Sequence, residues 1–339
     1  MSRVETEQAV VGAMRPDRRQ VDADPQPGGT LPLVIHPTDE SASIADWVAG
    51  HRATLAQYVH RQGGVLFRGF PVTSESALSD VAHALELQPM QYMEGATPRT
   101  RLSDYVYTST EFPADHAIAL HNELSYVKSW PMRILFLCLV PAETGGETPI
   151  ADMRRVLARI PQSIRDLFER RGWMLVRNYG DGLGLTWQTA FRVSSREAVE
   201  RYCHANDIRC EWRDDAHLRT SQTRPAIATH PVTGERVWFN HVAFWHVSSL
   251  PDVIRETMLA EYGERELPFN TFFGDGDPID DDIVAQIRDA WDAETTSFPW
   301  QAGDLLLLDN MLASHGRRAY TGLRRVVVCM GDPSGVERT

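Results

Sequence analysis

Two short motifs, far apart in the chain, place the strongest constraint on its fold. His121-Asn122-Glu123 lies in the first half of the 339-residue sequence, and His315-Gly316-Arg317 lies near its end. Two imidazoles and one carboxylate can bind one face of a ferrous ion and leave the opposite face open for a chelating acid and for dioxygen. If these groups share a metal, the fold must join segments separated by more than half of the chain.

The spacing within the first motif favours a shared metal. Among the 12 histidines, His121 alone has an acidic residue two positions later. Residues two apart on a strand project to the same face, so we expect His121 and Glu123 to bind one ion while Asn122 points away. His315 follows an apolar segment and the polar turn Asp309-Asn310. We expect His315 to supply the third ligand.

Simpler interpretations exist for each of these residues. Taken singly, His315 is better explained as a hydrogen-bonded structural histidine and Glu123 as a solvated charge. A second group, His230, His241 and His246, is an alternative zinc site, but it lacks zinc-finger spacing and a cysteine partner. The iron interpretation therefore depends on further motifs in the same chain.

Charge and cysteine content narrow the classes of partner. The chain has 34 Lys and Arg against 46 Asp and Glu, a formal net charge of −12, which disfavours binding to nucleic acid or to an anionic membrane. No apolar run has the length of a secretory signal or of a membrane span. The four cysteines form no C-x-x-C pair, so we expect reduced thiols, a cytoplasmic location and a small-molecule substrate.

The chain is expected to form one large domain. Residues 1–30 are predicted to be a flexible leader, because Asp22 to Gly29 is rich in proline and glycine. Residues 31–335 are predicted to be a single domain, since 42% hydrophobic residues suffice for a sizeable core. No internal repeat divides it.

Apolar runs and helical stripes predict a sheet core flanked by helices. The predicted strands are Leu33–Ile35, Gly64–Phe70, Arg133–Val140, Trp173–Asn178, Ala226–Thr229, Val237–Asn240, Leu305–Leu308 and Arg324–Met330. The predicted helices are marked by a capping box at Ser43, the stripe from Leu78 to Leu85, Pro161, a capping box at Ser194, Pro251 and the stripe from Ile283 to Trp291.

Further motifs give the chain a family resemblance. The blocks, in chain order, are His121-Asn-Glu123, Gly145-Gly-Glu-Thr148, Trp300-Gln-Ala-Gly-Asp304, Asp309-Asn310, His315-Gly-Arg317 and Arg324-Arg325. With these blocks the chain resembles the clavaminate synthase-like and taurine dioxygenase-like superfamily of Fe(II)/2-oxoglutarate oxygenases, over residues from about 64 to 330. Each block is weak alone, but together they occur in the order typical of that superfamily.

The resemblance implies an α+β fold and a defined set of cofactors. The expected core is a double-stranded β-helix (jelly roll, cupin-like) with flanking helices and a long helical insertion, over about residues 155–295, that forms a lid. His121, Glu123 and His315 would be the ligands of Fe(II), with 2-oxoglutarate as co-substrate and O2 as oxidant. Glutamate replaces the more usual aspartate, as in the clavaminate synthase-like branch. Halogenating relatives lack this carboxylate, so Glu123 favours oxidation without halide.

The resemblance also implies a cationic site for the far carboxylate of 2-oxoglutarate. A guanidinium gives a carboxylate two parallel hydrogen bonds, which a lysine cannot do. We expect Arg325 to point inward and strand alternation to send Arg324 to the other face. Thr148 would add a hydroxyl to the same carboxylate. Without the resemblance, Thr148 is equally a turn residue and the arginine pair a surface ion pair.

The substrate is predicted only as a class. Several blocks resemble a subgroup that hydroxylates amino acids for peptide natural products such as antibiotics, with the substrate free or tethered to a carrier protein. Asn122 and Arg219 are candidate substrate-binding residues, and Gly180 to Gly184 is either a mobile part of the lid or a plain flexible loop. The blocks are Arg177-Asn-Tyr179, Trp187, Phe191, Leu218-Arg-Thr220, His230-Pro231 and Val237-Trp-Phe-Asn240.

Other functions stay open from the sequence. One is a cupin-like protein that binds metal without redox chemistry, and another is an inactive binding module. An oxygenase of this class can also desaturate, epoxidise or cyclise its substrate, because the pose of the substrate decides the outcome. The arginine and Thr148 favour the oxygenase, since a metal site without a co-substrate needs neither.

Overall fold

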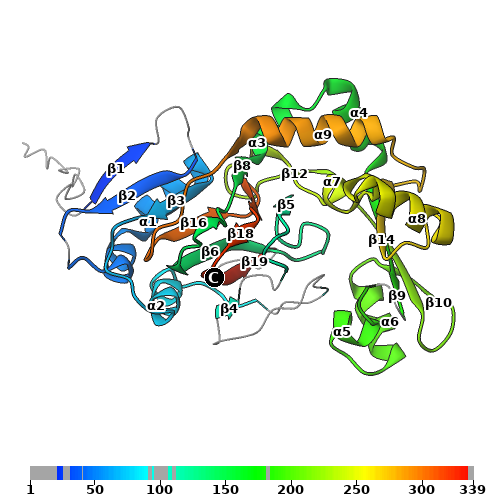
Figure 1. Cartoon of the computed structure of the whole chain (residues 1–339), viewed down its shortest axis with the longest axis horizontal. Helices are drawn as coiled ribbons and strands as arrows, with labels where there is room; N and C mark the ends of the chain where they lie inside the picture. Colours follow the sequence, from blue (N-terminus) through cyan, green and yellow to red (C-terminus); the bar gives the residue numbers. More distant parts are fainter. Residues whose placement is uncertain are drawn as a thin grey trace, which may run out of the picture.

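Two sheets packed through a shared apolar core form the centre of the molecule (Figure 1). The computed structural model describes residues 21–25, 31–39, 41–90, 94, 106–108, 112–180 and 184–334, with the backbone alone for 21–25. The mixture of helices and sheets confirms the expected α+β class.

The larger sheet has seven strands in the order β1-β2-β3-β16-β6-β19-β4. Neighbouring strands run antiparallel, except for the parallel pair β2 and β3. The strands are β1 (Val21–Pro25), β2 (Leu33–Pro37), β3 (Gly64–Phe67), β16 (Leu305–Asp309), β6 (Pro131–Val140), β19 (Arg325–Pro333) and β4 (Val106–Thr108).

The smaller sheet packs against one face of the larger one. Its four strands have the order β15-β8-β17-β5. Leu306 and Val328 of the larger sheet share one buried cluster with Ile150 and Ala313 of the smaller sheet, so the two sheets are layered face to face. The strands are β15 (Thr295–Thr296), β8 (Ile150–Asp152), β17 (Ala313–Arg317) and β5 (Ile118–His121).

Two helices cover the opposite face of the larger sheet. They are α1 (Ile44–Gln62) and α2 (Ser76–Ala84), and α1 begins where the capping box predicts, with the Ser43 hydroxyl accepting from the Asp46 N–H. Leu305 and Leu307 pack in a second buried cluster with residues of both helices. Burial on both faces explains why β16 is an unbroken apolar run instead of an alternating one.

The segment between β8 and β15 forms the insertion. It is not only helical, because it contains a four-stranded antiparallel sheet in the order β10-β11-β9-β14. Trp173 and Trp238 of this segment belong to the same buried cluster as the two central sheets, so the insertion shares their core. The strands are β9 (Trp173–Tyr179), β10 (Arg209–Trp212), β11 (Leu218–Arg224) and β14 (Phe269–Phe273).

Helices and two pairs of short strands complete the described residues. Figure 1 shows the long helix α9 beside α3, above the central sheets. The remaining helices are α3 (Met153–Arg159), α4 (Gln162–Arg171), α5 (Trp187–Phe191), α6 (Arg196–Ala205), α7 (Val242–Trp245), the 3-10 helix η1 (Val247–Ser249), α8 (Asp252–Tyr262) and α9 (Asp281–Glu294). The paired short strands are β12 (Ile227–Thr229) with β13 (Arg236–Trp238), and β7 (Thr144–Gly145) with β18 (Tyr320–Thr321).

Two local expectations were wrong. The tether expected from Asp22 begins instead with β1, which pairs with β2 because the edge of that strand is available for hydrogen bonding. The cap of α6 is Ser195 instead of Ser194, since the Ser195 hydroxyl is the one that accepts from the Ala198 N–H. The rest of the leader, residues 1–20 and 26–30, lies outside the described residues.

The cysteines and the helices bear on two further expectations. All four cysteines are free, and Cys138, Cys203 and Cys329 are buried, which confirms the expectation of reduced thiols. Among the described residues, every helix falls short of the length or the apolar character needed to span a membrane.

Burial of β16 on both faces predicts equal sensitivity of its two faces to truncation. Leu306→Ala and Leu307→Ala should each lower the free energy of unfolding by about 2–5 kcal/mol, because each removes a fully buried side chain from a different cluster. Leu323→Ala is the matched control, since Leu323 is 72% exposed. Denaturant unfolding measures all three, and a Leu307→Ala variant as stable as Leu323→Ala would contradict the two-sided packing.

Candidate metal centre and adjoining pocket

Three side chains from distant parts of the chain converge between the two sheets. In the antiparallel pairing of β5 and β17, His121 lies directly opposite His315. Glu123 Oε2 lies 3.8 Å from His315 Nε2 and 4.0 Å from His121 Nε2. The three ligand atoms all lie within 4.8 Å of one another, so these groups can bind one ion.

The chemistry of this donor set fits a divalent cation. The Nδ1–H of His121 donates to the Ala119 carbonyl at 2.9 Å, so the other ring nitrogen, Nε2, is the one placed on the side of Glu123. A neutral imidazole and a carboxylate at this separation can both bind one cation. Two imidazoles and one carboxylate are the ligand set of non-heme iron(II) sites. The residues present therefore fit the expected iron.

Glu123 lies in a turn after β5, so the expected alternation of side chains along one strand is not what brings it to the same site as His121. Strand β5 ends at His121, and Leu124 has a positive φ of 54°. Asn122 is fully buried, and its amide donates to the Asn310 carbonyl at 2.6 Å. Asn122 therefore holds the turn, a position that does not support the expected contact with substrate.

A small pocket opens beside the three ligands. It contains two of them, His121 and His315, together with two arginines and Thr148. The lining residues are Ile118, His121, Phe136, Thr148, His315, Gly316, Arg317, Arg324, Val326 and Val328.

Arg324, and not Arg325, belongs to this pocket, which corrects the expectation from the sequence. Arg324, Val326 and Val328 project to the pocket side of the chain leading into β19. Arg325 projects to the other side, where its exposed guanidinium pairs with Glu75 at 2.8 Å. Alternation along the strand is as expected, but its phase is the opposite one. Because Val326 to Met330 of β19 are buried on both faces, they are apolar at every position and give no sign of which face is inward.

The electrostatics of the pocket favour an anion. Burial and the neighbouring Arg317 guanidinium lower the pKa of Arg324 to about 10. Arg324 Nε donates to the Gly146 carbonyl at 2.9 Å, and a side chain at position 146 would be strained because Gly146 has a φ of 73° and an added Cβ would lie 3.0 Å from Arg324 Cδ. A carboxylate in the pocket would relieve the repulsion between the two guanidinium groups.

Sequence reasoning missed two residues that shape this pocket. Arg317 donates to the carbonyls of Phe112, Pro113 and His116, so it anchors the segment before β5. Trp300 Nε1 donates to the hydroxyl of Thr148 at 3.2 Å. Both residues belong to blocks on which the family resemblance rests, and that resemblance was the signal that could have identified them. No role was assigned to either residue from the sequence.

Helix α7 of the insertion forms a wall beside His121. The ring of Phe244 lies 4.9 Å from the ring of His121, and the ring of His241 lies 5.9 Å from it. Burial lowers the pKa of His241 well below its ordinary value, so this imidazole is neutral. Its Nδ1 lies 2.6 Å from the Ser125 hydroxyl. The wall next to the metal ligands is thus uncharged and largely aromatic.

The alternative zinc cluster does not form. His230 Nε2 lies 3.0 Å from Asp309 Oδ2, whereas His246 bonds to Ser248 and to the Ile279 carbonyl. His60 also lies near His230 and Asp309. His230 Nδ1 accepts from two backbone N–H groups, so its Nε2 carries the proton and donates to Asp309. This contact is a hydrogen bond between protein groups and does not need a metal.

Arg219 lies in the insertion sheet and is already engaged with protein groups. Its guanidinium pairs with Glu266 and donates to the Asn178 side chain and to the Arg265 carbonyl. It is not among the described residues that line the pocket beside the metal ligands. These contacts hold the sheet together and do not support the expected binding of a substrate carboxylate by Arg219.

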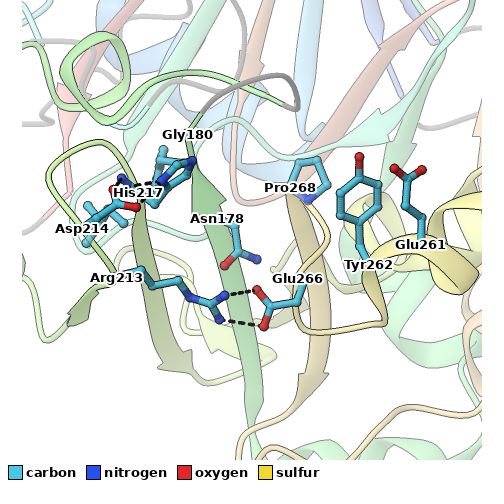
Figure 2. Close-up of a pocket in the computed structure, with 11 residues that line it drawn as sticks. Asn178, Gly180, Arg213, Asp214, His217, Glu261, Tyr262, Glu266 and Pro268 are labelled. Atoms are coloured by element: carbon cyan, nitrogen blue, oxygen red, sulfur yellow. Dashed lines mark hydrogen bonds and ion pairs between the residues drawn. The ribbon is translucent and has the colours of Figure 1, made fainter.

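A larger cavity of about 470 Å³ lies at one end of the insertion sheet. Figure 2 shows its two ion pairs, Arg213 with Glu266 and His217 with Asp214, which satisfy most of its charges internally. Gly180 also lines it, whereas residues 181–183 of the expected mobile loop lie outside the described residues. None of the three metal ligands lines this cavity, so it is separate from the metal centre.

Comparison with known proteins identifies the family of the chain. Residues 31–330 match the family described as taurine catabolism dioxygenase TauD, TfdA. The chain is 38% identical over 300 residues to the dapdiamide synthesis protein DdaC of Enterobacter agglomerans, covering 88% of this chain and 91% of that protein. It is 30% identical over 324 residues to a clavaminate synthase-like protein of Arabidopsis thaliana, covering 88% and 93%.

A solved structure with the same fold is that of PvcB from Pseudomonas aeruginosa. It has a TM-score of 0.56 and 16% identity, and the match covers 94% of this chain and 93% of PvcB. The fold and the metal centre thus define a non-heme iron- and 2-oxoglutarate-dependent dioxygenase. The chain belongs to the TauD/TfdA family.

The close approach of β5 and β17 predicts a requirement for glycine between His315 and Arg317. A Cβ at Gly316 would lie 2.6 Å from the Ile118 carbonyl oxygen, so Gly316→Ala must push β5 away and should lower the free energy of unfolding by about 1–3 kcal/mol. Gly50→Ala in α1 is the control, because nothing lies within 4 Å of its added Cβ. Equal stability of the two variants in denaturant unfolding would refute the close approach.

Proposed function

We propose that this dioxygenase hydroxylates an unactivated C–H bond of an amino acid or an amino-acid derivative in natural-product biosynthesis. His121, Glu123 and His315 hold Fe(II), and Arg324 with Thr148 binds the far carboxylate of 2-oxoglutarate. The observation that carries the proposal is that two of the three ligands, His121 and His315, line one small pocket together with the guanidinium-bearing residues Arg317 and Arg324. The two-sheet core is proposed to have jelly-roll connectivity, as the family resemblance implies.

The protein residues have separable tasks in this reaction. Iron, when bound, supplies the redox chemistry that couples the consumption of O2 and 2-oxoglutarate to oxidation of the substrate. Arg324 neutralises and orients the far carboxylate of the keto acid, and Thr148, fixed by Trp300, adds a hydroxyl. The neutral aromatic wall of Phe244 and His241 limits the access of water to the ligands.

The similarity to DdaC supports the choice of substrate class. Its name assigns that relative to dapdiamide synthesis, and 38% identity over most of both chains makes a related amino-acid-derived substrate the best candidate here. A carrier-bound thioester is proposed beside the free amino acid. A screen for succinate release over free amino acids and their carrier-bound thioesters distinguishes the two forms. Absence of turnover across both sets would argue against the substrate class.

The metal ligands give the first prediction for the proposed function. Glu123→Ala and His315→Ala should each weaken binding of one Fe(II) or Co(II) per chain by more than about a hundredfold, since each removes a direct ligand. The control is His217→Ala, which changes a half-exposed histidine paired with Asp214. Anaerobic titration of the metal-free protein measures the affinities. Unchanged affinity in both ligand variants would refute the site.

The two adjacent arginines give the second prediction. Arg324→Met should weaken 2-oxoglutarate binding by about 10- to 100-fold, because it removes charge-assisted hydrogen bonds to the carboxylate. Arg325→Met is the matched control and should leave binding nearly unchanged, since it breaks an exposed ion pair with Glu75.

The measurement is the weak visible charge-transfer band formed by Fe(II) and 2-oxoglutarate without air. A protein that binds metal without redox chemistry would give no such band. If instead Arg325→Met weakens 2-oxoglutarate binding and Arg324→Met does not, Arg325 binds the far carboxylate, as expected from the sequence.

A further inference from the structure

One side chain joins the two halves of the metal centre. Asn310 follows β16 in the turn that leads to β17, and it is fully buried. Its Oδ1 accepts from the backbone N–H of Glu123 at 2.8 Å, and its Nδ2 donates to the Glu123 carbonyl, also at 2.8 Å. Both backbone polar groups of the carboxylate ligand are therefore bonded to a single amide.

The other polar groups of Asn310 hold the same loop. Nδ2 also donates to the Pro131 carbonyl at 2.9 Å, and the Asn310 N–H donates to the Met132 carbonyl at 2.9 Å. The Asn310 carbonyl accepts from the Asn122 amide. The connection from β5 to β6, which carries Glu123, is thus bonded to Asn310 near its start and at its end.

Asp309 fixes the orientation of Asn310. Asp309 Oδ1 accepts from the N–H groups of Met311 at 2.9 Å and of Leu312 at 3.0 Å, so the turn is closed by its own first residue. Asp309 Oδ2 accepts from His230 of the insertion. The turn that carries Asn310 is therefore fixed by hydrogen bonds within the turn and by a hydrogen bond to the insertion.

Such support matters because Glu123 lies outside the ladder of β5. A carboxylate that must meet two imidazoles on one ion requires a backbone placed to a fraction of an ångström. We propose that Asn310 is a positioning residue of the metal centre, which sets Glu123 against His121 and His315 and thereby sets the affinity for the ion. The inference rests on the proposed function of the three ligands as a metal site.

The test compares two buried asparagines that both bond to backbone groups. Asn310→Ala should weaken Co(II) binding by about 10- to 100-fold, as expected for loss of a group that orients a metal ligand, and should alter the visible Co(II) spectrum. Asn270 is the control, because it is 2% exposed and its Oδ1 accepts from the Val247 and Thr271 N–H groups. Asn270→Ala should lower stability but leave Co(II) affinity within about twofold.

The outcomes separate this inference from the proposed function. A loss of less than about threefold in Asn310→Ala, or an equal loss in Asn270→Ala, would overturn the positioning role. If Asn310→Ala does not fold, Asn310→Asp is judged by the same threshold, since it keeps an acceptor for Glu123 but loses both amide donations. If Glu123→Ala binds Co(II) as tightly as the unmodified protein, the metal site itself is wrong.

Discussion

The pairing of β17 with β5 is the interaction on which the rest of the site depends. It sets His315 opposite His121, and the approach is so close that only glycine fits at position 316. A slip of one residue would turn His315 to the other face of the sheet, because side chains alternate along a strand. The second neighbour of β17, β8, pairs His315 with Ile150 and so holds the same register from the other side.

The insertion contributes to the metal centre as well as to the surface of the molecule. His230 bonds Asp309 next to the turn that holds Glu123, and Phe244 packs against His121. Figure 1 shows α7 between the central sheets and the outlying α8 and β14. Substitutions in the core of the insertion can thus change the positions of the proposed metal ligands through packed side chains and hydrogen bonds, even when the ligands themselves are unchanged.

Much of the architecture follows from local patterns in the sequence. Examples are the apolar run Leu305–Leu308, the apolar stripe of α9 and the cap at Ser43. Each reflects a local preference of the chain, which can be recognised without knowing which distant residues it contacts. The proposed metal ligands were recognisable for a different reason, since the required donor atoms restrict the residue types at each position. Strand β1 was missed because its pairing depends on the edge of β2 and not on its own proline-containing sequence.

The sequence by itself determined which residue types could bind the metal and the co-substrate, because histidine, glutamate and arginine are required by the chemistry whatever the fold. Only the tertiary structure decided which of two adjacent arginines faces the pocket, that Arg219 is engaged by Glu266, and that Asn310 holds Glu123. The reason is that these choices depend on contacts between segments far apart in the chain. From Val326 to Met330, β19 is apolar on both faces, so its inward face is set by the sheet packed against it and cannot be recognised from these residues alone.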